Sequence, residues 1–396
     1  MKLKKVLKTT LALALSATLV ACSGTTGGED KGGEAGDKPT YKIGLHFELT
    51  GAVADYGTAE NMAAKLAIKQ ANEKAGYEKY TGVEYDNKSD TTEAVSVANT
   101  IASQGVVGVV GPATSGASAA TYQLMNGANI IVISPSATQT NITLENPNDE
   151  NSKVYDYIYR VCFEDAYQGA AAAQFNFDTL KGMKSVIYGD SASDYSKGLM
   201  KAYKDQFTKL GGEIVSEEYY TAGDTDFSSV LTSIKAKDFD TLYIAGYYNE
   251  AGLIVKQARE MGMDVNILGG DGFDSETLVE LAGKENLNKV YFTTAYTTVN
   301  ASEELKSFIE SYKAEYNAEP NMFSALAFDS TNTLIQAIES ANSTDVKAIN
   351  EALAKIDFKG ITGEFKFDEK HTPLKSVLVV SLQDGVQTEA TSVSPK

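Results

Sequence analysis

Two neighbouring loops rich in hydroxyl groups are where residue types and spacing in this sequence could do chemistry. The stretch VVGVVGPATSGASAA (residues 106–120) runs from small apolar residues through Gly111 into Thr114, Ser115 and Gly116, and then resumes as a helical pattern. Such a loop, between a buried strand and a helix start, presents backbone N–H groups and the positive end of the helix dipole to an anion. A phosphate site normally adds Lys or Arg, and residues 106–128 contain neither. We therefore expect the anion to be a singly charged carboxylate.

The second loop, SPSAT at 134–138, repeats this arrangement one strand later. The alternative for both loops is that Ser and Thr only cap helices, a common role for these residues. A third loop, GGDGF at 269–273, is acidic and places Asp271 between glycines, which let a backbone approach a ligand closely. A carboxylate site together with an ammonium site favours a free amino acid as the ligand.

The residues of common catalytic and metal sites are scarce. The two histidines, His46 and His371, are not in metal-ligand spacing with Cys or with each other. The phosphate-loop, nucleophile-elbow and dinucleotide motifs are absent. Acidic residues number 53, so a hydrolytic carboxylate pair is possible, but no one pair stands out. The sequence favours a binding protein over an enzyme, with no catalytic residue, metal or cofactor.

The first residues are typical of a secretory leader. Residues 1–21 contain four lysines followed by an apolar run too short to span a bilayer, and LVAC ends at Cys22. This matches a bacterial lipobox, in which the Cys is lipidated; an ordinary signal peptide that happens to contain a Cys is the alternative. Residues 22–40 are rich in Gly and charge, which predicts a flexible tether. We expect an extracytoplasmic, lipid-anchored protein at the cell membrane.

Charge and cysteine content exclude several classes of protein. The chain after the leader holds 31 basic and 53 acidic residues, a net charge of −22. This balance argues against binding to nucleic acid or to anionic lipid. Cysteines occur at Cys22 and Cys162, so Cys162 cannot form an internal disulfide and is expected to be a small buried side chain.

Short apolar runs alternate with segments of helical period along the chain. The runs begin at residues 41, 105, 129, 184, 212, 240, 265, 289 and 376, and segments such as 59–76 and 197–212 lie between them. This alternation predicts an α/β fold of doubly wound parallel sheets, and the chain length favours two domains. In such sheets ligands bind outside the carboxyl ends of the strands, where all three loops above are found.

The opening IGLHFELTGAVADYGTAENMAAKLAIKQAN resembles that of the branched-chain amino-acid (Leu/Ile/Val) binding proteins of ABC importers. GPATSG, SPSAT, the segment around DYSKGL, TAGDTDFSSVLTSIKAKDFDTLYIAGYYNEAG and LGGDGF follow in the same order, so the resemblance covers 41–382. It implies a type I periplasmic-binding-protein fold, with two lobes that close on the ligand by hinge bending. The implied lobes are 41–163 plus 295–364 and 164–294 plus 365–396, with crossings near Phe163, Ala295 and Phe365.

The resemblance also implies roles for individual residues. Ser115 and the N–H groups that follow it, including that of Gly116, would hold the ligand carboxylate together with Thr138. The Ser136 carbonyl and the Thr138 hydroxyl would receive the ammonium, and Asp271 would neutralise it. Tyr247 would reach across from the second lobe, and the side-chain pocket would be walled by Tyr56, Ala113, Tyr195 and Phe323.

Three positions depart from the family pattern. Some members fasten the first pocket loop with a disulfide, and Ser89 and Thr114 occupy the matching places here. The acid that neutralises the ammonium is often Glu, and Asp271 is one methylene shorter. Glu48 puts a charge where a small or apolar residue is common. The last two departures bear on the identity of the ligand more than on its class.

The implied function is capture of an amino acid, with Leu, Ile or Val expected, and its delivery to permease and ATPase subunits by a monomeric binding protein. Rivals of the same fold bind another small polar solute, such as an amide, urea or an aromatic amino acid, or report ligand to a receptor without transport. A hydrolase on this scaffold is the enzyme rival, and it lacks an identifiable nucleophile or metal set.

Overall fold

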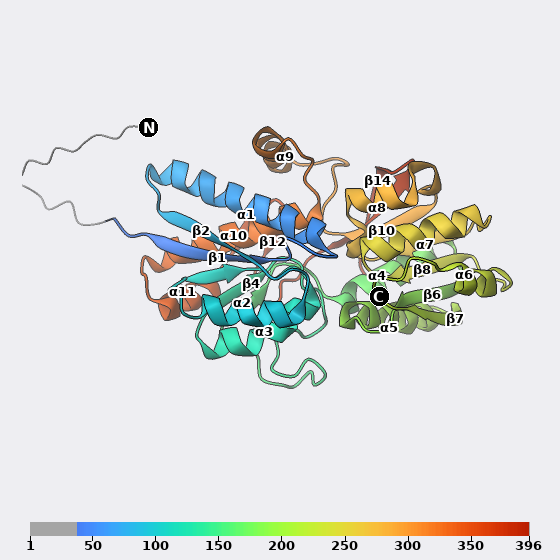
Figure 1. Ribbon diagram of the computed structural model, residues 1–396, viewed down its shortest axis with the longest axis horizontal. Helices are drawn as coiled ribbons and strands as arrows, with labels where there is room; N and C mark the ends of the chain where they lie inside the picture. The colour runs from blue at the N-terminus through green and yellow to red at the C-terminus, as the bar shows by residue number, and fades with distance from the viewer. Residues whose placement is uncertain (1–37, 396) are drawn as a thin grey trace, which may run out of the picture. The chain divides into compact units, whose positions relative to one another are not determined.

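The computed structural model describes residues 38–395, and the chain from Pro39 onward forms one compact unit. The predicted signal peptide, the lipidation site Cys22 and the predicted tether up to residue 37 lie outside the described residues. The described part contains two larger sheets and one short hairpin (Figure 1).

The first sheet has five parallel strands in the order β2-β1-β3-β4-β5. The interior strand β1 is buried at every position except Lys42, as is typical of a parallel strand covered on both faces. The strands are β1 (Tyr41–Phe47), β2 (Tyr80–Asp86), β3 (Gly108–Val110), β4 (Ile131–Ser134) and β5 (Ile158–Arg160).

Helices cover both faces of the first sheet (Figure 1). On one face α1 (Ala54–Ala75) packs along α10 (Met322–Ala341), and on the other α2 (Thr91–Ile101) packs against α3 (Ser115–Gly127). The C-cap of α1 is Gly76, in the left-handed conformation that glycine adopts without strain. The helices α9 (Glu303–Tyr316) and α11 (Val346–Leu353) contact α1 and α10 respectively.

The second sheet has seven strands in the order β14-β13-β10-β9-β8-β6-β7. Five of these strands run parallel, while β13 runs antiparallel to β10 and β14 antiparallel to β13. The strands are β6 (Lys184–Asp190), β7 (Glu213–Tyr220), β8 (Thr241–Ala245), β9 (Asn266–Gly269), β10 (Val290–Thr294), β13 (Val377–Gln383) and β14 (Val386–Val393).

The second sheet carries an antiparallel edge beside its parallel strands. Asp384 and Gly385 alone separate β13 from β14, and both have positive φ, 49° and 77°. Two such residues form the tight turn that joins antiparallel strands, and Asp-Gly is a preferred pair for it. The sequence signal for this hairpin was therefore present in LQDGVQ.

The second sheet is also covered on both faces (Figure 1). The elements α4 and α5 lie against each other on one face, and α6, α7 and α8 lie on the other. Their bounds are α4 (Asp165–Phe175), a π-helical turn η1 (Asn176–Leu180), α5 (Asp194–Lys209), α6 (Ser228–Lys235), α7 (Tyr248–Glu260), the 3-10 turn η2 (Asp271–Phe273), α8 (Glu276–Ala282) and the 3-10 turn η3 (Lys284–Asn286).

The chain passes between the two layered parts three times. It does so between β5 and α4, between β10 and α9, and after the hairpin of β11 (Phe358–Gly360) and β12 (Gly363–Phe365) on the way to β13. The predicted crossing points near Phe163, Ala295 and Phe365 fall in or at these connections. The exact lobe boundaries stay a prediction.

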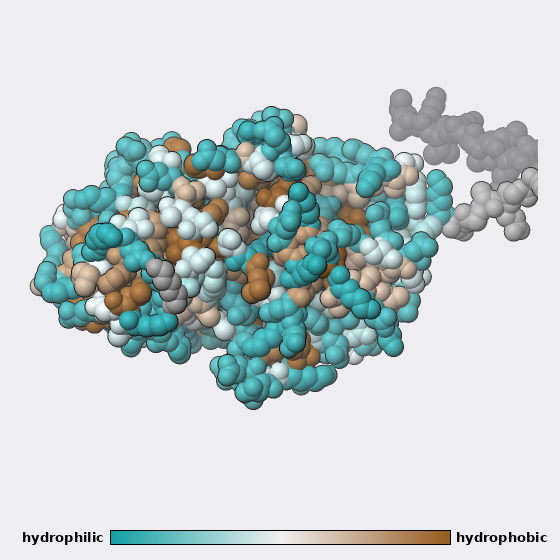
Figure 2. All heavy atoms as spheres, turned by 180° about the vertical axis from the view of Figure 1, so that it is seen from behind, coloured by the Kyte–Doolittle hydropathy of each residue, from teal (hydrophilic) through white to brown (hydrophobic). Residues whose placement is uncertain are grey.

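The surface is predominantly hydrophilic. On the face in Figure 2, hydrophilic side chains predominate and apolar ones form small groups among them. Among the described residues, the exposed large apolar side chains are Met183, Tyr219, Leu374 and Val386. A search of residues 38–395 finds no helix with the length and apolarity needed to cross a bilayer.

Gly111, which joins β3 to the first hydroxyl loop, generates a prediction about stability. Its φ is +110°, and a Cβ at this position would lie 2.0 Å from the carbonyl oxygen of His46. We expect Gly111→Ala to lower the free energy of unfolding by at least about 2 kcal/mol, because strain and overlap add. The control is Gly127→Ala, where no atom lies within 4 Å and φ is not positive. Chemical denaturation of both variants checks this, and equal stabilities would contradict it.

Candidate ligand-binding site

A narrow cavity lies where strands of both sheets end. From the first sheet it is lined by residues that follow β3 and β4, and from the second by residues that follow β8 and β9, as expected for parallel α/β sheets. The lining residues are Tyr56, Ala113, Thr114, Ser115, Ser136, Thr138, Tyr195, Tyr247, Asp271, Gly272 and Phe323.

The structure brings nine of the ten predicted ligand-binding residues to this one cavity. The exception is Gly116, which is the second residue of α3, is exposed, and does not line the cavity. Thr114 and Gly272 line it in addition.

Thr114 and Ser115 of the first hydroxyl loop both line the cavity, but only Thr114 caps the helix. Thr114 is the N-cap of α3, and its hydroxyl accepts a hydrogen bond from the Ala117 N–H at 3.3 Å. Ser115 is the first helical residue and is only 2% exposed. Its hydroxyl oxygen accepts from the Gln139 N–H at 3.1 Å, which fastens this loop to the segment after the second one.

Glu48 is hydrogen-bonded to the first hydroxyl loop. One carboxylate oxygen accepts from the Ala113 N–H (3.0 Å), and the other accepts from the Thr114 N–H (3.1 Å) and the Thr114 hydroxyl (2.7 Å). Burial raises the pKa of Glu48, and these three donors oppose that shift. The charge that departs from the family pattern therefore organises the loop and is absent from the cavity lining.

Hydrogen bonds also occupy the positions where a disulfide would fasten this loop. The Ser89 hydroxyl donates to the Thr50 carbonyl (2.8 Å) and accepts from the Val53 N–H (3.2 Å). Thr114 is bound to Glu48, as described above. The loop that contains Ser89 and the first hydroxyl loop are thus both hydrogen-bonded to the segment that follows β1.

On the side of the second sheet, Asp271 is buried and held by two donors. Its Oδ1 accepts from the Tyr195 hydroxyl at 2.7 Å and from Nε2 of Gln168 at 3.0 Å. The pKa of Asp271 is raised to about 6 because the carboxyl is buried, and these hydrogen bonds limit the rise. The carboxyl is 2% exposed and faces no Lys or Arg in the cavity lining.

Gln168 joins Asp271 to a second buried carboxyl, that of Asp165. Its Nε2 donates to both aspartates, at 2.8 Å to Asp165, and its Oε1 accepts from the Thr293 hydroxyl at 2.7 Å. Burial, and then the like charge of Asp271, raise the pKa of Asp165 to about 8. Two buried carboxyls therefore lie close together, and a bound cation would favour their ionised forms.

Aromatic rings form the remaining wall. Tyr56 stacks on Phe323 with ring centres 4.1 Å apart, and Tyr195 stacks on Tyr247 at 5.0 Å. Tyr56 and Tyr247 meet edge to face at 5.6 Å. The rings supply an apolar surface that a hydrocarbon side chain could contact.

Hydrogen bonds connect the two layered parts at the rim of the cavity. The Tyr56 hydroxyl donates to the Gly272 carbonyl at 2.6 Å, and the Ser275 hydroxyl donates to Asp55 at 2.7 Å. The space left inside is about 10 Å³, room for about one water molecule. An amino acid could therefore enter only after the two sides have moved apart.

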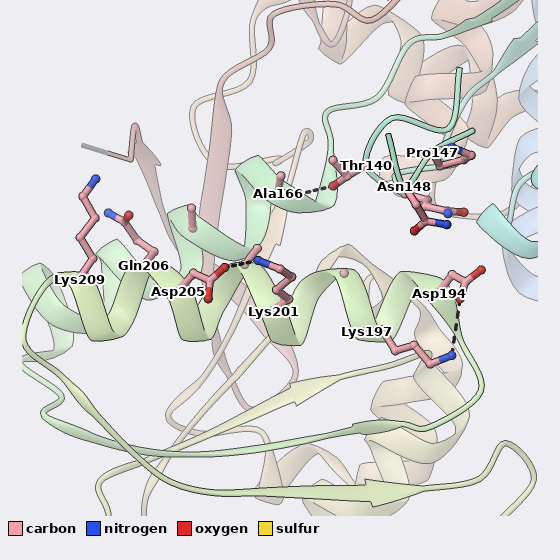
Figure 3. Close-up of a pocket in the computed structure, with 14 residues that line it drawn as sticks. Thr140, Pro147, Asn148, Ala166, Asp194, Lys197, Lys201, Asp205, Gln206 and Lys209 are labelled. Carbon is pink, nitrogen blue, oxygen red and sulfur yellow. Dashed lines mark hydrogen bonds and ion pairs between the residues drawn. The ribbon is translucent and has the colours of Figure 1, made fainter. Parts of the chain in front are cut away.

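A larger hollow lies elsewhere, beside α5, the start of α4 and the loop 139–148 (Figure 3). It measures about 620 Å³, and its charged residues pair along the helix, Lys197 with Asp194 and Lys201 with Asp205. These lysines are exposed, and surface ion pairs of this kind contribute little to the stability of the fold. The hollow therefore lacks the buried, convergent polar groups of the narrow cavity.

Sequence reasoning missed three polar residues next to the cavity, Glu60, Asp165 and Gln168. All three are fully buried, and each lies in a helix that carries other polar residues. The order ED-x-x-Q in EDAYQG gave no sign that Gln168 would reach Asp271, which is 103 residues away. Across residues 38–395, no three or more His, Cys, Asp and Glu side chains gather in a way that could hold a metal ion. The one described cysteine, Cys162, is fully buried as expected.

Known proteins resemble this chain over most of its length. A family model described as periplasmic binding protein matches residues 40–387. The chain belongs to the periplasmic binding protein family. It is 29% identical to the leucine-, isoleucine-, valine-, threonine-, and alanine-binding protein of Pseudomonas aeruginosa, over 84% of this chain and 86% of that one. It is 28% identical to the leucine-specific-binding protein of Salmonella typhimurium, over 83% and 87% respectively.

Solved structures of the family have the same fold. The branched-chain amino acid transporter substrate binding protein LivJ of Streptococcus pneumoniae, in complex with isoleucine, is 41% identical. It matches with a TM-score of 0.84 over 90% of this chain and 100% of that one. The leucine binding protein LivK of Thermotoga maritima is 32% identical, with a TM-score of 0.82 over 90% and 99%. The predicted resemblance to the branched-chain amino-acid binding proteins and the predicted type I fold are thus confirmed.

The buried Asp165 generates a prediction about pH. Its pKa is about 8 in the folded protein, above the value of about 3.9 expected in the unfolded chain. The folded state therefore binds more protons between about pH 4 and pH 8, so this residue's contribution to stability is lost as the pH rises through that window. We expect Asp165→Asn to flatten the fall in melting temperature from pH 5 to pH 8. Asp238→Asn, at a side chain 91% exposed, is the control; identical profiles for the native protein and Asp165→Asn would contradict the prediction.

Proposed function

We propose that this protein is the solute-binding component of an ABC importer and that it captures a free amino acid, with Leu, Ile or Val preferred, between two lobes. One observation carries the proposal. A single cavity has a hydroxyl and helix N-terminus on one side, a buried carboxyl on the other, and aromatic rings between them. These three features match the carboxylate, the ammonium and the hydrocarbon side chain of such a ligand.

The ligand carboxylate would lie at the start of α3. Ser115 offers its hydroxyl there, and the N–H groups of the first helical turn have no partner within the helix. Thr138 reaches the same cavity from the segment after β4. No Lys or Arg lines the cavity, so the helix dipole and neutral donors are left to stabilise a single negative charge.

The ligand ammonium would lie between the Ser136 carbonyl, the Thr138 hydroxyl and Asp271. An unpaired ammonium in a dry cavity is costly, so a carboxylate partner is required. Asp271 is fixed in place by Tyr195 and Gln168, and Gln168 also contacts the buried carboxyl of Asp165. The ammonium would favour the ionised forms of both aspartates.

Binding would require the lobes to open and close. The proposed lobes are residues 41–163 with 295–364, and 164–294 with 365–396. Tyr56, Ala113 and Phe323 would wall the side-chain pocket from the first lobe, and Tyr195 and Tyr247 from the second. The hydrogen bonds from Tyr56 to Gly272 and from Ser275 to Asp55 are of the kind that would form on closure.

The proposed partners are permease and ATPase subunits that receive the amino acid from a monomeric binding protein without catalysis. The motif LVAC and the polar stretch after it support a lipid anchor at Cys22 on the cell membrane. The variant Cys22→Ser should no longer incorporate a lipid label and should no longer be recovered in the membrane fraction as mature lipoprotein. Retention of both would overturn the anchor.

For the carboxylate end, we expect Ser115→Ala to weaken leucine binding by about 1–3 kcal/mol, the usual loss of a hydrogen bond to a charged group. Ser118→Ala, on the same helix, is the matched control, because Ser118 is equally buried but does not line the cavity. Calorimetry gives both affinities. Equal affinities in the two variants would show that the first loop only begins a helix.

For the ammonium end, Asp271→Asn keeps the shape of the side chain and removes its charge. We expect a loss of about 3–5 kcal/mol, or roughly a hundred- to several-thousand-fold in Kd for leucine. Native affinity should also fall below about pH 6, where Asp271 takes up a proton. Asp190→Asn is the control, a buried carboxyl at the end of β6 that does not line the cavity. Unchanged leucine binding by Asp271→Asn would place the ammonium elsewhere.

A further inference from the structure

Glu60 is a fully buried carboxyl beside the cavity for which the proposed function has no use. It lies on α1, is 0% exposed, and contacts the Ser136 hydroxyl through Oε1. Its Oε2 has no hydrogen-bond partner. Ser136 itself lines the cavity.

The hydrogen atoms at Ser136 decide the protonation of this carboxyl. The Ser136 hydroxyl oxygen lies within hydrogen-bond distance of Glu60 and is 2.8 Å from the Ala113 carbonyl oxygen. A serine hydroxyl has one hydrogen to donate, and a carbonyl oxygen can only accept. If Glu60 were ionised, one of the two contacts would set two oxygens against each other without a hydrogen between them. If Glu60 carries a proton, it donates to Ser136, and Ser136 donates to Ala113.

The surroundings of Glu60 favour this arrangement. Burial, together with the nearby charge of Glu48, raises the pKa of Glu60 well above its ordinary value. Glu48 has three donors from the first loop, whereas Glu60 has only Ser136. The three donors favour the ionised form of Glu48, whereas the single contact and full burial favour the neutral form of Glu60.

In the described part of the chain, no Lys, Arg or His contacts Glu60 to favour its ionised form. One turn earlier on its own helix the titratable residue is Tyr56, and the loops 111–118 and 134–138 contain none. The helix α10, packed along α1, carries Asp329 and Glu339. Asp329 is bonded to residues 361 and 362, and Glu339 pairs with Lys79.

We propose that Glu60 is held as a neutral carboxylic acid and that it positions Ser136 and, through Ser136, the loop that presents Ser115 to the ligand. The Ala113 peptide is then fastened on both sides, its N–H by Glu48 and its carbonyl by Ser136. A neutral Glu60 also adds no second negative charge behind the site that receives the ligand carboxylate. Glu60 is thus a positioning residue, and its part in binding rests on the proposed function.

The protonation state can be measured without any ligand. Infrared difference spectra of the native protein against Glu60→Gln at pH 7 should show loss of the C=O stretching band of a protonated carboxylic acid. Loss of the carboxylate stretching bands in its place would overturn the proposal, whether or not the protein binds leucine. This result is independent of the proposed function.

The positioning role is tested by leucine affinity in three variants. Glu60→Gln still donates to Ser136 through its amide, so its affinity should stay within about threefold of the native protein. Glu60→Ala and Ser136→Ala lose the relay to the Ala113 carbonyl and should bind about tenfold more weakly, the factor expected for one hydrogen bond. If Glu60→Gln loses as much affinity as Glu60→Ala, a neutral donor is not what the loop requires. If the native protein binds no amino acid, the proposed function fails and the infrared result still decides the state of Glu60.

Discussion

The buried carboxyl of Asp271 is the feature on which the rest of the site depends. A carboxylate removed from water needs donors or a cation, and two helices beside the second sheet supply the donors. Tyr195 comes from α5, Gln168 from α4, and Thr293 of β10 holds Gln168 in turn. With the donors arranged in this way, Asp271 would pair with the cationic end of a ligand that enters the cavity.

The opposite side of the cavity follows a different principle. No charged side chain lines it there, and what it offers an anion is a hydroxyl and the N-terminus of α3. Its geometry depends on two carboxyls that stand behind it, with Glu48 on the N–H groups and Glu60 on the carbonyl side through Ser136. Negative groups thus shape the anion site without facing the anion. Closure of the two sides would then join a site for each charge of a zwitterion.

Much of the architecture could be predicted from the sequence because apolar runs and helical periods are local patterns. All nine predicted runs contain a strand. The short strands β11 and β12 and the edge strand β14 were missed, and so were β2 and β5. Both lie at the edges of the first sheet, where β2 is only half-buried and β5 has three residues. The site residues came chiefly from the family resemblance, because composition alone could not choose among 22 tyrosines and 53 acidic residues. Gln168 and Glu60 could not be predicted, since their roles depend on contacts with residues 103 and 76 positions away.

We propose that the two ends of the cavity recognise opposite charges of one molecule. Calorimetric titration of the native protein with leucine and with two analogues tests this directly. The analogues are 4-methylpentanoic acid, which lacks the amino group, and 3-methylbutylamine, which lacks the carboxylate. We expect leucine to bind and each analogue to bind at least about a hundredfold more weakly, since each analogue leaves one end of the cavity without its charged partner. Binding of either analogue as tightly as leucine would contradict it.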